Sequence, residues 1–124
     1  MAEKNNRKMG AAFEQKAAEY LAGQGYQILE RNHKNRGGEI DIIARDKEML
    51  VFTEVKYRAN VCCGDPLEAV HQRKQRRICM AVLYYYRKHG YGMTQPCRFD
   101  VIAFYGNGLF RHIQNAFEFQ LHHI

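Results

Sequence analysis

The clearest pattern of apolar and polar positions lies between residues 38 and 58. Two runs rich in Ile, Val, Phe and Leu flank the polar segment 45–48, which predicts two β-strands joined by a short turn. Parallel pairing would need a crossover of about a dozen residues, and this segment has no room for one. The two strands are therefore predicted to pair antiparallel, with the turn near Lys47 and Glu48.

The charged positions of this hairpin gather at one end. Side chains alternate between the two faces of a strand, so Ile40, Ile42 and Ala44 are predicted to share one face of the first strand. In the second strand, Glu54 and Lys56 end a face that is otherwise apolar. Both strands are thus predicted to be mostly buried and to become charged only where the first begins and the second ends.

Two carboxylates from different strands are predicted to meet at this charged end. A turn near residues 47–48 places Asp41 roughly opposite Glu54, with Lys56 beside them. Like charges that face each other on a sheet repel, and buried carboxylates are costly without a counter-charge. A divalent metal held by Asp41, Glu54 and the carbonyl of Val55 would supply that charge and could polarise a phosphate.

A simpler interpretation of Glu54 and Lys56 is a surface ion pair along one strand. If Glu54 and Lys56 were the only charged residues here, this interpretation would be preferred, because opposite charges two residues apart stabilise an exposed face. It leaves unexplained the second carboxylate, Asp41, and the cations that crowd the start of a later helix. Clustering of this kind favours a functional site.

The rest of the chain predicts an α/β domain. Apolar positions at helical spacing predict a helix from Met9 to about Ala22, ended by Gly23 or Gly25. The other predicted elements are a strand over 26–30, a polar loop over 31–38, a short helical turn over 65–70, a helix over 72–88 and strands over 98–105 and 109–113.

Basic residues precede the hairpin in the predicted loop. Arg31, Lys34 and Arg36 are solvated in the simpler interpretation, and contact phosphate in the second, because the loop leads directly to the carboxylates.

A second group of cations, Arg73, Lys74, Arg76 and Arg77, occupies the first turns of the predicted helix over 72–88. The helix macrodipole disfavours cations there. Phosphate binding and pairing with the carboxylate cluster are both open, beside a solvated basic face.

Two other polar features are predicted to be structural. Asp100 shares a strand face with Arg98, and we expect it to be the half-buried partner of a basic residue such as Arg77 rather than a metal ligand. The run of tyrosines over 84–86 is expected to pack in the core rather than to stack on bases. In the tail, the apolar residues expected to dock onto the domain are Phe117, Phe119 and Leu121.

The central motif resembles a known nuclease signature. Glu-Ile-Asp at 39–41 followed by Glu-Val-Lys at 54–56 resembles PD-(D/E)xK, with Ile40 in place of Pro at a position that varies in such nucleases. With Gly38 before it and Arg58 after it, the chain resembles the YraN-type family of small bacterial proteins, which is related to archaeal Holliday-junction resolvases. The resemblance implies a restriction-endonuclease-like fold, with a central mixed β-sheet, an antiparallel hairpin core and flanking helices.

The resemblance also implies a function. We expect a nucleic-acid-binding protein, a Mg²⁺- or Mn²⁺-dependent endonuclease of DNA repair or recombination that hydrolyses phosphodiester bonds in DNA and selects branched structures. Resolvase relatives act as two-fold dimers, so a homodimer is expected by analogy. The alternative is a non-catalytic nucleic-acid-binding module on the same fold.

These expectations assign roles to named residues. Asp41, Glu54 and Lys56 would be catalytic, and Glu14 and Glu39 would join Asp41, Glu54 and the Val55 carbonyl around the metal. The residues expected to hold nucleic acid are Arg31, Arg36, Arg58, Arg73, Lys74 and Arg77.

Length and composition agree with this interpretation. The chain has 124 residues and a net charge of +6, which suits one domain and a polyanionic partner. We expect a disordered segment over 1–8 and a single domain over 9–124. No apolar run reaches the length of about 18 residues that spans a membrane, and 1–8 lacks the apolar part of a secretory signal. The protein is thus expected to be cytoplasmic, with its four cysteines reduced.

Overall fold

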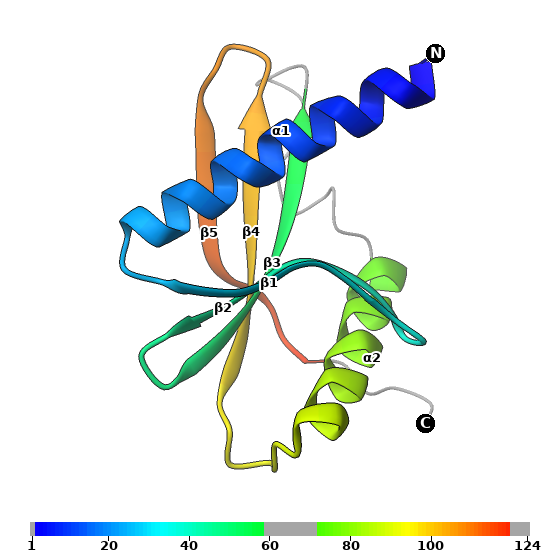
Figure 1. Cartoon of the computed structure of the whole chain (residues 1–124), viewed down its shortest axis with the longest axis vertical. Coiled ribbons are helices and arrows are strands. Elements are labelled where there is room, and N and C mark those ends of the chain that lie inside the picture. The colour runs from blue at the N-terminus through cyan, green and yellow to red at the C-terminus, as the bar shows by residue number, and fades with distance from the viewer. Residues whose placement is uncertain (1, 59–71, 120–124) are drawn as a thin grey trace.

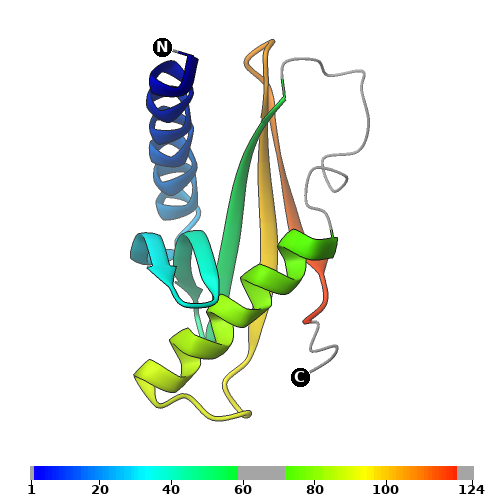
Figure 2. The ribbon, with the colours of Figure 1, turned by 90° about the vertical axis from the view of Figure 1, so that its right-hand side faces the viewer.

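The computed structural model describes residues 2–58 and 72–119, with the backbone alone for 2–9. Seven elements follow in chain order: α1 (Ala2–Gly23), β1 (Gln27–Asn35), β2 (Gly38–Asp46), β3 (Met49–Arg58), α2 (Gln72–His89), β4 (Cys97–Tyr105) and β5 (Phe110–Phe117). The strands form one sheet in the order β1-β2-β3-β4-β5, and α1 and α2 lie on its opposite faces (Figure 1, Figure 2). Neither helix is long and apolar enough to cross a membrane within these ranges.

The sheet is mixed. β1–β2, β2–β3 and β4–β5 pair antiparallel, whereas β3 and β4 run parallel, with α2 in the crossover between them. The predicted α/β class, with an antiparallel hairpin inside a mixed sheet flanked by helices, is confirmed. The arrangement is compatible with a restriction-endonuclease-like fold. The hairpin turn falls at 47–48 as predicted, and Lys47 has a φ of 58° there.

The first helix starts earlier than predicted. We expected it from Met9 after a disordered segment over 1–8, but α1 begins at Ala2. Most side-chain types in this segment, including Ala, Glu, Lys, Arg and Met, favour helix, and extending a formed helix adds one hydrogen bond per residue. The predicted end is confirmed. Gly25 has a φ of 95°, and the Tyr26 N–H donates back to the Leu21 carbonyl at 3.0 Å, which closes a Schellman motif.

The first strand is longer than predicted, and the expected loop over 31–38 is wrong. β1 continues to Asn35 and pairs with β2, so that only a tight turn at 36–37 remains. An edge strand tolerates polar side chains, because one of its sides faces solvent. His33 is buried between Glu30 and Asn35, with a hydrogen bond of 2.8 Å to each, and Asn35 also donates to the Ala81 carbonyl at 2.9 Å.

The β1–β2 turn is held against α2 by close backbone contact. A Cβ at Gly37 would lie 2.5 Å from the backbone nitrogen of Ala81, so no larger residue fits without displacing the helix or the turn. Figure 1 shows this turn beside α2. The predicted boundaries of α2 are confirmed to within one residue, and the predicted buried stripe is found, namely Ile78, Ala81, Val82 and Tyr85.

Each face of the sheet carries its own apolar cluster. Ala17 and Leu21 of α1 pack over Ile42 and Ala44, while Ile40 packs on the α2 side. The predicted common face for Ile40, Ile42 and Ala44 is therefore wrong for Ile40. The β2–β3 pairing ends at Ile42 and Thr53, so the alternation of faces breaks at Asp41, where β2 leaves β3. This break positions the site described below.

The C-terminal strand extends the sheet further than predicted, to Phe117. Phe117 is buried and its ring stacks on Phe99 with centroids 4.8 Å apart, which confirms its predicted docking. Phe119 also stacks on Phe99, at 6.3 Å, while Leu121 and the predicted helical turn over 65–70 lie outside the described residues. The predicted packing of the tyrosine run holds for Tyr85, which is buried in the α2-side cluster.

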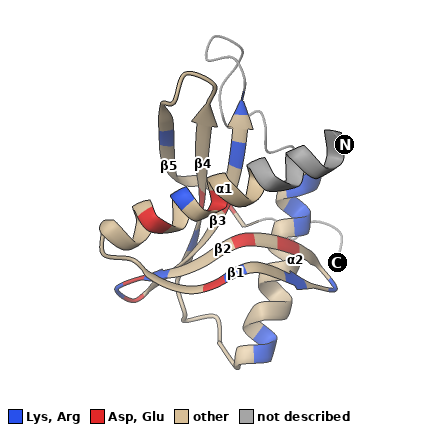
Figure 3. Ribbon diagram, turned by 45° about the horizontal axis from the view of Figure 1, so that its top comes forward, with Lys and Arg blue, Asp and Glu red and all other residues tan. Residues whose placement is uncertain are grey.

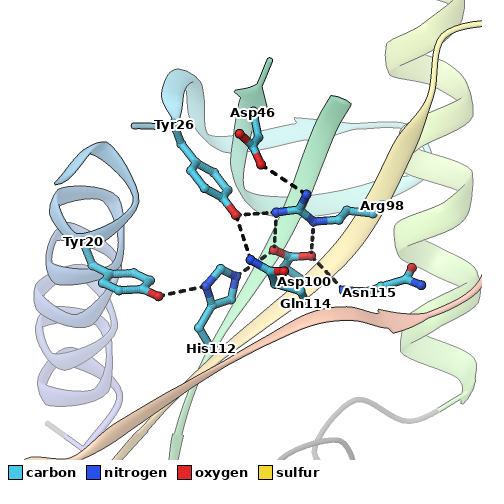
Figure 4. Close-up of polar contacts among 8 residues, drawn as sticks. All are labelled: Tyr20, Tyr26, Asp46, Arg98, Asp100, His112, Gln114 and Asn115. Atoms are coloured by element: carbon cyan, nitrogen blue, oxygen red, sulfur yellow. Dashed lines mark hydrogen bonds and ion pairs between the residues drawn. The ribbon is translucent and has the colours of Figure 1, made fainter. Parts of the chain in front are cut away.

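A buried polar network ties α1 to β4 and β5 (Figure 4). Asp100 is fully buried and accepts hydrogen bonds from Arg98 Nε at 3.0 Å, from the Asn115 N–H at 3.1 Å and from His112 Nε2 at 2.7 Å. The Tyr20 hydroxyl of α1 forms a hydrogen bond of 3.1 Å with the other ring nitrogen of His112, Nδ1. The basic partner of Asp100 is Arg98, and the expected partner Arg77 is wrong, because Asp100 connects through His112 to Tyr20 of α1 (Figure 4), while Arg77 belongs to α2 on the other face.

The charge of Asp100 should carry a large share of the stability. Burial alone would raise its pKa, but hydrogen bonds from His112 and Arg98 outweigh burial and hold the pKa below the usual value. We expect Asp100→Asn to lower the free energy of unfolding by about 3 kcal/mol near neutral pH, because Arg98 then loses its buried partner. Urea unfolding monitored by circular dichroism measures this difference.

The pH dependence supplies the check. Because the folded pKa is depressed, the contribution is complete above the pKa of an unfolded aspartate, about 3.9, and is lost as the pH falls through the lower folded value. The difference in the free energy of unfolding between wild type and Asp100→Asn should therefore become smaller at acidic pH. Asp46→Asn is the matched control, since Asp46 touches Arg98 only at 3.4 Å and is partly exposed, and it should cost less than about 1 kcal/mol. A gap that is independent of pH would contradict this account.

Candidate functional site

The candidate site forms where β2 leaves β3. The antiparallel pairs run from Asp46–Met49 to Ile42–Thr53, and Asp41 and Glu54 are the next residues on the two strands. Beyond the last pair, the Asp41 carboxylate takes over from the backbone, as its Oδ2 accepts a hydrogen bond of 2.8 Å from the Val55 N–H. The two carboxylates thus lie beside each other at the end of the hairpin, as the position of the turn predicted. We call the place where Asp41 and Glu54 meet the carboxylate corner.

Glu54 is buried between two lysines from different elements. Its side chain is 6% exposed, and its Oε1 lies 3.3 Å from Lys56 Nζ of β3 and 2.5 Å from Lys74 Nζ of α2. Of the two uses predicted for the cations of α2, the structure therefore brings Lys74 to the carboxylate cluster. Figure 3 shows acidic residues on α1 and β2 and basic residues on β3 and the first turns of α2 around this corner of the sheet.

The crowding of carboxylates changes the proton affinity of Asp41. Burial and then the negative charges of Glu54 and Glu14 raise the pKa of Asp41 to about 7, although the hydrogen bond from Val55 and the charge of Lys74 oppose the rise. A carboxyl group with such a pKa is only partly ionised at neutral pH. A cation at this corner would favour the ionised form.

Glu14 reaches the same corner from α1. It is half-buried, and burial raises its pKa, as do the negative charges of Glu54 and Glu39. A hydrogen bond with Asn32 of β1 opposes the rise. Asn32 has a φ of 53°, in the left-handed region. No role at the site was predicted for Asn32, since that role depends on the continuation of β1 through the expected loop.

The two lysines respond to this corner in opposite ways. Burial and the neighbouring Lys74 lower the pKa of Lys56, and Glu54 only partly offsets them. Burial also opposes the charge of Lys74, but Glu54 and Asp41 outweigh it and raise the pKa of Lys74. Lys56 is therefore the lysine that loses its proton more easily, while Lys74 stays protonated and balances the negative charge of Glu54.

The other predicted site residues lie around this corner in different settings. Glu39 is exposed and pairs with Lys34 at 3.5 Å, at the rim rather than beside Asp41. Arg31 donates to Gln15 Oε1 of α1 at 2.6 Å. Arg36 is exposed at the β1–β2 turn, and Arg58 ends β3.

The remaining predicted cations, Arg73 and Arg77, share a groove with Lys74. It lies between β2 and α2, has a volume of about 430 Å³ and includes Glu39 in its lining. The predicted nucleic-acid-binding residues thus divide between this groove, the β1–β2 hairpin and the end of β3.

The donor set fits a magnesium ion. Mg²⁺ is commonly held by one or two carboxylates, with water completing its shell, and Asp41 and Glu54 provide two at one place. In the ranges that the structure describes, no three His, Cys, Asp or Glu side chains gather into a ready-made metal cluster. Ligation by Glu14, Glu39 or the Val55 carbonyl remains a prediction. Lys56 and Lys74 now balance the charge that a cation would balance on Glu54.

Comparison with known proteins places this arrangement in a family. The model of the "Uncharacterised protein family UPF0102" matches residues 13–104, which include α1, the carboxylate corner and β4. The chain belongs to the UPF0102 family. This is the YraN-type family whose resemblance the central motif indicated.

Relatives within the family match over most of their length. A UPF0102 protein of Lachnoclostridium phytofermentans is 48% identical over 92% of this chain and 96% of its own. One of Pseudomonas putida is 38% identical over 95% of this chain and 99% of its own. Another, of Klebsiella pneumoniae, is 42% identical over 90% and 88%.

The raised pKa of Asp41 predicts that the site costs stability. Between about pH 4, near the pKa of an unfolded aspartate, and about pH 7, the folded protein keeps a proton that the unfolded chain releases, so stability falls as the pH rises. Asp41→Asn keeps an acceptor for the Val55 N–H and removes the charge. We expect it to raise the free energy of unfolding by about 2 kcal/mol near pH 8, and by little near pH 4, in urea unfolding.

Glu39→Gln is the matched control, because Glu39 is an exposed carboxylate of the same strand. It should leave the stability within about 0.5 kcal/mol of wild type at both pH values. If Asp41→Asn is no more stable than wild type near pH 8, Asp41 is not held in a repulsive cluster.

Proposed function

We propose that this protein is a metal-dependent endonuclease that hydrolyses phosphodiester bonds in DNA in the cytoplasm and selects branched structures. The observation that carries the proposal is the meeting of Asp41 and Glu54 at the end of the hairpin, with Lys56 on the same strand as Glu54. The fold itself does not require this cluster. Backbone hydrogen bonds and apolar side chains could end the strand pair with a smaller loss of folding free energy than buried charged groups.

The chain's own residues would divide the work. Asp41 and Glu54 would hold Mg²⁺ or Mn²⁺, which when bound lowers the pKa of a water molecule and balances charge on the scissile phosphate. Lys56, whose pKa is lowered by burial and by Lys74, would orient the attacking water or accept its proton. Lys74 would leave Glu54 for the phosphate as the cation takes its place. Glu14 would add a ligand from α1.

Substrate would be held through its backbone. Arg31, Arg36, Arg58, Arg73 and Arg77 supply positive charge on elements around the corner, and such contacts position phosphates without reading bases. This supports selection of DNA by structure rather than by sequence. A two-fold dimer, by analogy with resolvases, would bring two such sites to a symmetrical junction.

A second candidate is a nucleic-acid-binding module without cleavage. The ion pairs of Glu54 with Lys56 and Lys74 favour it, since they complete the charge balance of the site without a metal. The two candidates differ in one respect. Only the nuclease requires Asp41 and Glu54 to bind a divalent cation.

Cleavage of branched, flapped and linear DNA with Mg²⁺ or Mn²⁺ tests the proposal. Wild type should cut at least one branched substrate, and Asp41→Asn and Lys56→Ala should each lower the rate by at least about 100-fold. Lys47→Ala is the control, because Lys47 is exposed at the far turn of the same hairpin, and it should cut like wild type. Cleavage that survives in both site variants would refute this site.

Metal binding gives a readout that does not need activity. Millimolar Mg²⁺ should raise the melting temperature of wild type, because a ligand of the folded state stabilises it, and should not raise that of Glu54→Gln. Wild type that binds every DNA without cutting it, and whose melting temperature does not respond to Mg²⁺ or Mn²⁺, would establish the binding module instead.

A further inference from the structure

A groove lies beside the carboxylate corner, and its lining is rich in basic residues. It has a volume of about 430 Å³ and opens between the β1–β2 turn and the first turns of α2. The residues that line it are Gly38, Glu39, Arg73, Lys74, Arg77 and Ile78.

The β1–β2 turn packs closely against the backbone of α2 beside this groove. A Cβ at Gly38 would lie 3.2 Å from the Arg77 carbonyl oxygen, and one at Gly37 would collide with the α2 backbone at 2.5 Å. The turn therefore cannot move closer to α2, and the contacts of Asn35 with Ala81 prevent it from moving away freely. The two walls are held at a fixed separation.

Two of the three cations that line the groove have no carboxylate partner among the residues that the structure describes. Arg73 and Arg77 lie one helical turn apart, which places them on one face of α2. Both are exposed, and neither forms an ion pair with a carboxylate among residues 10–58 and 72–119. Their position in the first turns of a helix is unfavourable for positive charge. An anion in the groove would remove this penalty.

Lys74 connects the groove to the candidate site. It lines the groove and also reaches Glu54 Oε1 at 2.5 Å. Lys74 is therefore the residue shared by the groove lining and the carboxylate corner. A strand whose phosphates contact Arg73 and Arg77 would have Lys74 as its next contact towards Glu54.

We propose that this groove binds a single, unpaired nucleic-acid strand and delivers it to the carboxylate corner. This inference rests on the proposed function and specifies its substrate. A volume of a few hundred cubic ångströms matches a small organic ligand, which is the size of one nucleotide, whereas a duplex brings two strands with their bases paired. Substrates with a single-stranded end or gap at a branch satisfy this requirement.

The lining suits a strand better than a free phosphate. Ile78 offers apolar surface to a base, and the Glu39 carboxylate would repel a groove filled with phosphate alone but can accept a hydrogen bond from a base amino group. Among the residues that the structure describes, no aromatic ring lines the groove, so the described lining offers a base no ring to stack on. Affinity should depend on phosphate contacts and fall steeply with salt.

Binding in EDTA tests this without any cleavage. A short fluorescent oligonucleotide is titrated with protein as a single strand and as a blunt duplex, and anisotropy is measured at several salt concentrations. Wild type should bind the single strand at least about tenfold tighter. The double variant Arg73→Ala with Arg77→Ala should lose about tenfold for the single strand and reduce the magnitude of the salt slope by about 2.

Arg76→Ala is the matched control, because Arg76 is exposed between the two groove residues but does not line the groove. It should bind within about twofold of wild type. Equal affinity for duplex and single strand, an equal loss in Arg76→Ala, or displacement of the oligonucleotide by the same concentration of a mononucleotide would each overturn the inference. If the inference fails while Asp41→Asn still abolishes metal-dependent cleavage, the proposed function stands and only the strand groove is wrong.

Discussion

The hydrogen bond from the Val55 N–H to the Asp41 carboxylate is the constraint on which this structure depends. It lies where the β2–β3 ladder ends, so it closes the sheet with a charged side chain where a backbone carbonyl would otherwise serve. This arrangement brings Asp41 to Glu54, whose negative charge adds to burial in raising the pKa of Asp41. The surrounding elements supply what the pair lacks: Lys56 from β3, Lys74 from α2 and the position of α1.

The two helices act on this corner from opposite faces of the sheet. α1 brings Glu14, and its own position is secured by Tyr20, which reaches the buried His112–Asp100 pair (Figure 4). α2 brings Lys74 and is fixed against the β1–β2 turn by Gly37. Lys74 of the groove lies on the α2 side of the sheet, and Glu14 lies on the α1 side. Both reach the carboxylate corner at the place where the β2–β3 ladder ends.

The sequence predicted much of this corner, because a hairpin with a short turn has a fixed register. Asp41 and Glu54 follow from counting outward from Lys47, and the stripe of α2 follows from helical spacing. The predictions that were wrong depended on contacts between residues that are distant in the sequence. The strand at 31–35 is polar because it is an edge, and Ile40 changes sides because β2 bends at Asp41. Arg77 could not be excluded as a partner of Asp100 until the helices were assigned to faces.

The most direct test of the central claim is the titration of Asp41 itself, followed by the carboxyl ¹³C shift in NMR spectra of the metal-free protein. The account predicts a pKa of about 7, which falls towards the ordinary aspartate value when Mg²⁺ is added or when Glu54 is replaced by Gln. An Asp41 that titrates near pH 4 in wild type, and responds neither to Mg²⁺ nor to Glu54→Gln, would show that the two carboxylates do not form one site.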